Sequence, residues 1–301
     1  MSAPHAEENG QSTPAFNATF TLDEFRVLQT QLPELALPAA LDVGTIADSV
    51  GDGSADKRRE RALESLHATC DPTDPLLRLA LTLPVAAEYS IHVQAWTPST
   101  TSQTLVALNP SVTSVITIML PRDTTADFSS PHTSHGGTVQ VTLGSRSIIV
   151  EELLSLLDEA PAEPARVEPT TVRIGVVESR SLIEAIKQGD AEVVEQLALQ
   201  FQAADALPLL RPLAGTMEAG FRMQVFAQPG RPVFSTEWFQ ASTTEWVTAR
   251  LSATAEPGDG KVTAQTITDT GTLELSRWPL STLTAEILSL VASIPAEGTR
   301  V

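Results

Sequence analysis

The sequence predicts an α+β fold in which two pseudo-twofold-related halves share a central antiparallel sheet flanked by helices. Two observations lead to this prediction. Segments with helical spacing of apolar residues and segments with strict alternation follow one another in both halves of the chain. Three segments of the first half also recur in the second, in the same order, at separations of 133, 132 and 134 residues. The length of 301 residues and the hydrophobic content of 42% suffice for one or two packed cores.

The recurring segments are a helix start, a strand and a closing helix. They are Pro75–Arg78 with Pro208–Arg211, Tyr89–Val93 with Phe221–Val225, and Glu151–Glu163 with Ala285–Glu297. The last pair shares seven of thirteen residues. Chance similarity between two Leu/Ala-rich helices is the alternative, but agreement of the offset over three segments favours duplication. A repeat this long is not a solenoid repeat, which spans about 20–50 residues.

The domain organisation follows from composition. Residues 1–18 are polar and acidic and predict a disordered tail. Residues 19–160 form the first α+β half and residues 171–297 the second. Between them, 161–170 is rich in proline and acidic residues, which is typical of a semi-rigid connector. We expect both halves to form one fused globular body.

In the first half, Thr21 precedes acidic residues and predicts a helix that ends before Pro33. A loop over 43–56 leads to a helix over 57–69, and the Asp74-Pro75 pair predicts a third helix through Leu83. Alternation then predicts strands over 89–95, 105–108, 112–120 and 139–143, followed by a helix over 147–159.

In the second half, 172–177 is a predicted strand, and helices over 182–188 and 191–201 flank Gly189-Asp190. Several strands are expected between Phe221 and Ser276. Proline-glycine turns at 228–231 and 256–260 separate them.

The charge excludes several partners. The formal net charge is −18, and acidic residues interrupt the one basic cluster, over 57–61. Nucleic acids and anionic membranes are therefore poor partners. The N-terminus lacks a signal-peptide pattern, no segment is apolar enough to span a bilayer, and the single cysteine, Cys70, cannot form an intrachain disulfide. These features predict a cytoplasmic protein.

Enzyme motifs are absent from the sequence. It contains no phosphate-binding glycine loop and no nucleophile elbow, and one cysteine cannot build a cysteine-type zinc site. His132 and His135 lie in a polar loop without a third ligand at a clear spacing. We therefore expect no catalytic residues, no metal and no cofactor. The plentiful carboxylates keep a carboxylate-dependent hydrolase open as an alternative, because the sequence alone cannot pair two of them.

Four aromatic residues of the second half are the candidate partner-binding residues. They are Phe234, Trp238, Phe239 and Trp246. One interpretation places them in the core of the sheet. The other is an exposed apolar patch, which usually marks a partner site in a soluble protein. Because strand residues alternate between faces, both can hold for different members.

The order of elements resembles the EspG family of type VII (ESX) secretion chaperones. The resemblance rests on Phe20–Leu28 with Leu37-Pro38, the helix over 57–70, the strand over 139–143 with its helix, and the strand and helix over 273–290. It covers roughly residues 19–297. One departure is the segment Ser242–Arg250, which lacks the glycine and tyrosine of an Asp-Thr-x-x-Gly-Arg-Tyr-like run found in family members.

The resemblance implies two related α+β halves about a central sheet and a non-enzymatic cytosolic role. Such chaperones bind the apolar tip of helical PE–PPE heterodimers through the central sheet and C-terminal helices, and keep these substrates soluble until export. No individual contact residue carries over to this chain. The sequence favours a monomer, and a homodimeric scaffold protein remains an alternative function.

Overall fold

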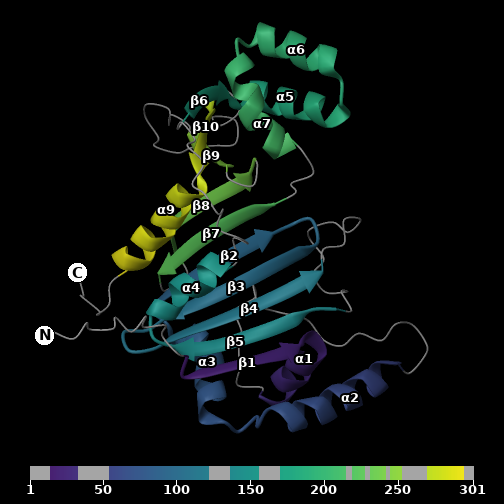
Figure 1. The fold of residues 1–301 in the computed structure, drawn as a ribbon, viewed down its shortest axis with the longest axis vertical. Coiled ribbons are helices and arrows are strands. Elements are labelled where there is room, and N and C mark those ends of the chain that lie inside the picture. The colour runs from purple at the N-terminus through teal and green to yellow at the C-terminus, as the bar shows by residue number, and fades with distance from the viewer. Residues whose placement is uncertain are drawn as a thin grey trace, which may run out of the picture.

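A computed structural model describes residues 14–32, 54–121, 136–155, 170–214, 219–227, 231–241, 245–252 and 270–294. Ten antiparallel strands form one continuous sheet in the order β1-β5-β4-β3-β2-β7-β8-β9-β10-β6 (Figure 1). The strands are β1 (Phe16–Thr21), β2 (Tyr89–Trp96), β3 (Thr100–Leu108), β4 (Thr113–Pro121), β5 (Thr138–Gly144), β6 (Thr170–Gly175), β7 (Gly220–Ala227), β8 (Arg231–Gln240), β9 (Glu245–Ser252) and β10 (Thr272–Pro279). This sheet confirms the predicted fold class.

The strand order is mirrored about the middle of the sheet. The central strands β2 and β7 pair antiparallel, with Tyr89 opposite Ala227 and Trp96 opposite Gly220. Outward from this seam, the first half adds β3, β4, β5 and β1, and the second half adds β8, β9, β10 and β6. The two halves are thus related by a pseudo-twofold axis and joined by a shared sheet, as the sequence predicted. Whether gene duplication produced this symmetry stays a prediction.

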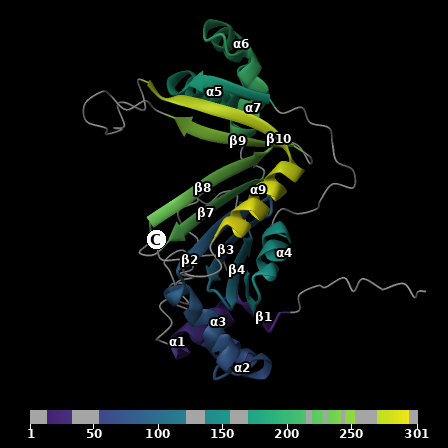
Figure 2. The same cartoon turned by 90° about the vertical axis from the view of Figure 1, so that its left-hand side faces the viewer.

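Helices cover both faces of the sheet (Figure 2). The helices are α1 (Leu22–Gln31), α2 (Ser54–Thr69), α3 (Pro75–Ala86), α4 (Ser147–Ser155), α5 (Val176–Gln188), α6 (Ala191–Gln200), the short 3₁₀ helix η3 (Ala204–Ala206), α7 (Leu207–Ala214) and α9 (Leu280–Ser293). Of these, α1–α3 pack against the first half and α5–α7 against the second half. On the opposite face, α4 and α9 cross the middle of the sheet over one core shared by both halves.

Alternation along the strands explains this layering. In β4, Ile116 packs with α1–α3, whereas its neighbour Val115 packs with α4 and α9. Side chains of successive strand residues point to opposite faces, so both faces of a central strand carry apolar residues. Arg146, just before α4, donates to the carbonyls of Val291 and Ile294 at the end of α9 and ties the two crossing helices together.

Local signals define the helix ends. Thr21 caps α1 in a capping box with Glu24, whose carboxylate accepts the Thr21 N–H at 2.6 Å. Asp74 caps α3, and Asp190 caps α6. Gly189 ends α5 with a φ of 73°, a left-handed conformation that glycine adopts without strain. Each of these ends agrees with the sequence prediction.

The structure corrects several boundaries. Phe16–Ala18 belong to β1 instead of the predicted tail, because these residues pair with Thr142 and its neighbours in β5. Residues 54–56 begin α2 instead of ending a loop, and Val176 and Val177 begin α5 instead of ending a strand. The predicted connector reaches into β6 at Thr170, and the rest of it, like residues 1–13, lies outside the described residues. In the described ranges, no helix is long and apolar enough to cross a membrane.

Candidate functional site

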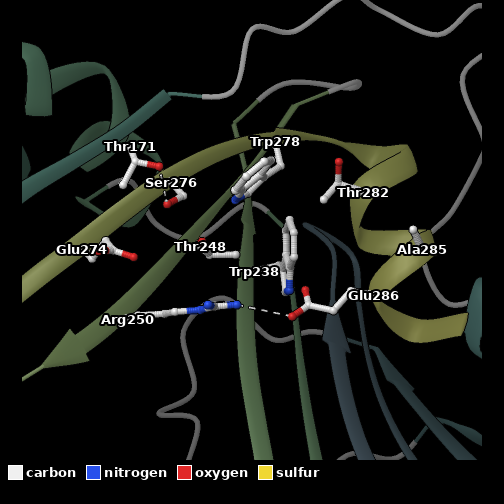
Figure 3. Close-up of a pocket in the computed structure, with 10 residues that line it drawn as sticks. All are labelled: Thr171, Trp238, Thr248, Arg250, Glu274, Ser276, Trp278, Thr282, Ala285 and Glu286. Carbon is white, nitrogen blue, oxygen red and sulfur yellow. Dashed lines mark hydrogen bonds and ion pairs between the residues drawn. The ribbon is translucent and has the colours of Figure 1, made fainter. Parts of the chain in front are cut away.

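A cleft of about 420 Å³ lies between the second half of the sheet and α9 (Figure 3). Five elements supply its walls, namely β6, β8, β9, β10 and α9. Its lining residues are Thr171, Trp238, Thr248, Arg250, Glu274, Ser276, Trp278, Thr282, Ala285 and Glu286. Most are polar or aromatic, so the cleft suits a polar group flanked by aromatic rings.

Strand register places these side chains on one face. In the β9–β10 ladder, Thr248 lies opposite Ser276 and Arg250 lies opposite Glu274. Val247 and Leu275 alternate with these residues and point to the other face, where they are buried against α5–α7. Leu280 and Leu283 bury one side of α9 in the shared core. The helix then presents Thr282 and Glu286 to the cleft.

Short polar contacts hold the cleft walls. Thr171 and Ser276 share a hydroxyl hydrogen bond of 3.0 Å. Arg173 forms an ion pair with Glu274 at 2.8 Å. Each of these contacts joins β6 to β10.

Across the cleft, Arg250 of β9 approaches Glu286 of α9 at 3.4 Å. The Trp238 indole N–H donates to the Thr236 hydroxyl at 2.9 Å. Burial raises the pKa of the Glu286 carboxyl, and Arg250 and the Trp238 indole oppose that rise. The folded protein therefore stabilises the charged form of this carboxyl less well than water stabilises that of an exposed glutamate.

Glu286 gives a pH-dependent contribution to stability. Because its pKa is raised in the folded protein, the folded state holds the proton at pH values where the unfolded state has released it. The free energy of unfolding therefore falls as pH rises from the ordinary pKa toward the raised one. In Glu286→Gln this fall is absent, so the variant becomes more stable relative to wild type as pH increases. Urea unfolding between about pH 4 and pH 7 measures the difference, and a constant difference over that range would contradict the prediction.

The structure places the four predicted partner-binding residues in or beside the core. Trp238, Phe239 and Trp246 are buried, with at most 4% of each side chain exposed, and Phe234 is half-buried. Trp238 and Trp246 belong to the shared core under α9, and Trp238 also forms a wall of the cleft. Phe239 points to the opposite face and packs edge-on against Trp96. This arrangement fits the sheet-core interpretation for three of them, and partner binding stays a prediction for all four.

The sequence did not identify the cleft itself. Its residues span positions 171 to 286, and Trp238 is the only one of them among the four predicted partner-binding residues. The alternation of Glu274 and Ser276 with Leu273 and Leu275 indicated a half-exposed strand. That pattern cannot show that α9 would fold over the exposed side.

The described residues bear on two expectations, on metal binding and on paired carboxylates. No group of three His, Cys, Asp or Glu side chains in those ranges could hold a metal ion, and His132 and His135 lie outside them. Glu274 and Glu286 line the same cleft, but each pairs with an arginine of its own. Such an arrangement is typical of structural ion pairs and does not single out a general acid or base.

Comparison with known proteins identifies the fold. No family profile and no curated protein matches the sequence. Among solved structures, that of the Mycobacterium tuberculosis type VII secretion system chaperone EspG5 in complex with the PE25–PPE41 dimer matches with a TM-score of 0.51 at 10% sequence identity. The match covers 93% of this chain and 97% of the other. This chain therefore has the fold of the type VII secretion chaperone EspG5, as the resemblance predicted.

Proposed function

We propose that this protein is a cytosolic, non-enzymatic chaperone for a helical type VII secretion substrate of the PE–PPE kind. The observation that supports the proposal is the likeness in fold, over nearly the whole of both chains, to a chaperone solved with a PE–PPE dimer. Capping of an apolar helix tip would keep the substrate soluble before export. The net charge of −18 would keep the chaperone itself soluble.

We also propose that the aromatic segment of β8 and β9 contributes to this contact. Phe234 is its half-buried member and offers surface for a direct contact. Trp238, Phe239 and Trp246 would support the shape of the sheet beneath it, since they are buried.

Co-expression tests the proposal directly. Together with the PE–PPE-like pair encoded near its gene, the protein is expected to elute from size exclusion as a 1:1:1 complex. Light scattering of the free protein should give a monomer of 32.1 kDa. A stable dimer that binds no pair would favour the homodimeric scaffold instead, and failure with every such pair would contradict the chaperone role.

Phe234→Ala is expected to weaken substrate binding about tenfold, because truncated aromatic anchors dominate interface energies. Leu199→Ala is the matched control, since Leu199 is 76% exposed on α6, away from the aromatic segment. Isothermal titration calorimetry against the purified pair measures both variants. Equal affinities of the two variants for the pair would show that Phe234 does not contribute to the contact.

A further inference from the structure

The sheet divides between β8 and β9. Although β8 spans ten residues, it pairs with β9 only through Trp238, Phe239 and Gln240. Beyond the pair of Trp238 with Thr248 the two strands diverge (Figure 2), whereas β8 keeps its pairing with β7 and β9 keeps its pairing with β10. We call this gap the fork. Within the described ranges, no strand fills it.

Backbone hydrogen-bonding groups of β8 point into the fork. The Ala241 N–H donates to the Glu245 carbonyl at 2.9 Å, on the β9 side. Backbone groups of successive residues alternate between the two sides of a strand. Ser235 and Glu237 therefore direct their N–H and C=O groups into the fork. Among the residues that the structure describes, no strand pairs with this edge of β8. An unpaired strand edge is a template for a further strand.

The cleft begins where the fork begins. Trp238 and Thr248 form the last pair before the strands diverge, and both line the cleft. A strand laid along β8 would therefore place one of its side chains next to the cleft, because side chains alternate between faces. The backbone edge and the side-chain cleft thus form one continuous surface.

The chemistry of the cleft favours a cationic side chain. Two carboxylates, Glu274 and Glu286, line it together with one guanidinium, Arg250, and two indoles, while Arg173, the ion-pair partner of Glu274, is not among the lining residues. Carboxylates attract a cation, and so does an indole face. The half-buried Trp278 can offer such a face, whereas Trp238 is buried. Arg250 is 65% exposed and its ion pair with Glu286 is long, at 3.4 Å, so the pair contributes little. The net charge of −18 also favours a cationic ligand.

We propose that the fork binds an extended segment of a partner protein by strand addition to β8, with a lysine or arginine of that segment in the cleft. Main-chain hydrogen bonds would supply affinity and the cleft would supply specificity. The proposal is independent of the proposed function, which concerns a helical substrate, so either can fail without the other.

Synthetic peptides test the proposal on the full chain. The probe is a fluorescein-labelled peptide of eight residues that alternates valine and threonine around one central lysine. A second peptide carries glutamate at the centre, and a third keeps the lysine but is N-methylated at alternate backbone nitrogens. Fluorescence anisotropy is expected to show binding of the lysine peptide and about tenfold weaker binding of each of the other two.

Protein variants locate the cation. Glu286→Gln should weaken binding of the lysine peptide several-fold. Arg250→Ala should strengthen it, because Arg250 competes with the lysine for Glu286. Glu192→Gln is the matched control, since Glu192 is exposed on α6, and should leave the affinity unchanged.

Three results would overturn the proposal. No binding of the lysine peptide at about 1 mM would exclude the site, since that affinity corresponds to only about 4 kcal/mol. Undiminished binding of the N-methylated peptide would exclude strand addition. Equal binding of the glutamate peptide, or weaker binding by Arg250→Ala, would exclude a cation in the cleft.

Discussion

Trp238→Ala is expected to lower the free energy of unfolding by about 3–5 kcal/mol. Trp238 is 1% exposed and is one of the largest fully buried side chains in the described structure. Its removal leaves a cavity in the core shared by β7, β8 and α9, and it leaves the Thr236 hydroxyl without its indole donor. The cost therefore combines lost apolar burial with a lost hydrogen bond.

Urea unfolding followed by circular dichroism measures this loss, because tryptophan fluorescence itself changes in the variant. Leu199→Ala serves as the control and should change stability by no more than about 0.5 kcal/mol, as is usual for exposed positions. A loss below about 1 kcal/mol in Trp238→Ala would show that the core under α9 is loosely packed.

Local signals in the sequence predicted most of the elements. The capping residues Thr21, Asp74 and Asp190 act within one helical turn, so their meaning does not depend on the rest of the fold. The alternation of Ile91 and Val93 with polar neighbours likewise predicted β2. The sequence predicted whether these segments are helices or strands because their local signals agree with the tertiary structure.

Elements that depend on distant partners were harder to predict. Phe16, Ala18 and Phe20 alternate with polar residues, yet the short run gains its strand structure by pairing with β5, more than 100 residues away. Similarly, Thr100–Thr104 reads as polar loop but extends β3, where Thr104 is buried and hydrogen-bonds Thr117 of β4 at 3.0 Å. A polar residue with a buried partner cannot be recognised from its own position.

The candidate site also combines features that local sequence signals indicate with features that depend on distant parts of the chain. The aromatic segment of β8 and β9 was visible in the sequence, but whether each ring faces the core depends on the sheet face that α9 covers. The fork depends on how many residues of β8 and β9 pair, which no local pattern determines. The resemblance predicted the overall fold, whereas the cleft and the fork arise from the packing of elements that lie far apart in the sequence.

A second large loss of stability is expected from a substitution at the seam between the two halves, where β2 pairs with β7. At Gly220, an added Cβ would fall within the ring of Trp96, its partner in the β2–β7 ladder. Trp96 is 5% exposed and packs against Phe239, so its ring has little room to move. We expect Gly220→Ala to destabilise the protein by about 1–3 kcal/mol through overpacking. Gly136→Ala is the matched control, because its Cβ would meet Pro121 at an ordinary 3.6 Å.

A second substitution tests whether the Trp96 ring causes the loss of stability in Gly220→Ala. Trp96→Leu removes the ring that the new methyl group would strike, so the double variant should lose less stability than the sum of the two single variants, by about 1 kcal/mol or more. Urea unfolding of the four proteins of this cycle measures the coupling. Additive losses would show that contact with the Trp96 ring is not the cause of the destabilisation. A measured coupling would instead establish that the Trp96 ring, lying over a residue without a side chain, closes the seam through which the two halves share one sheet.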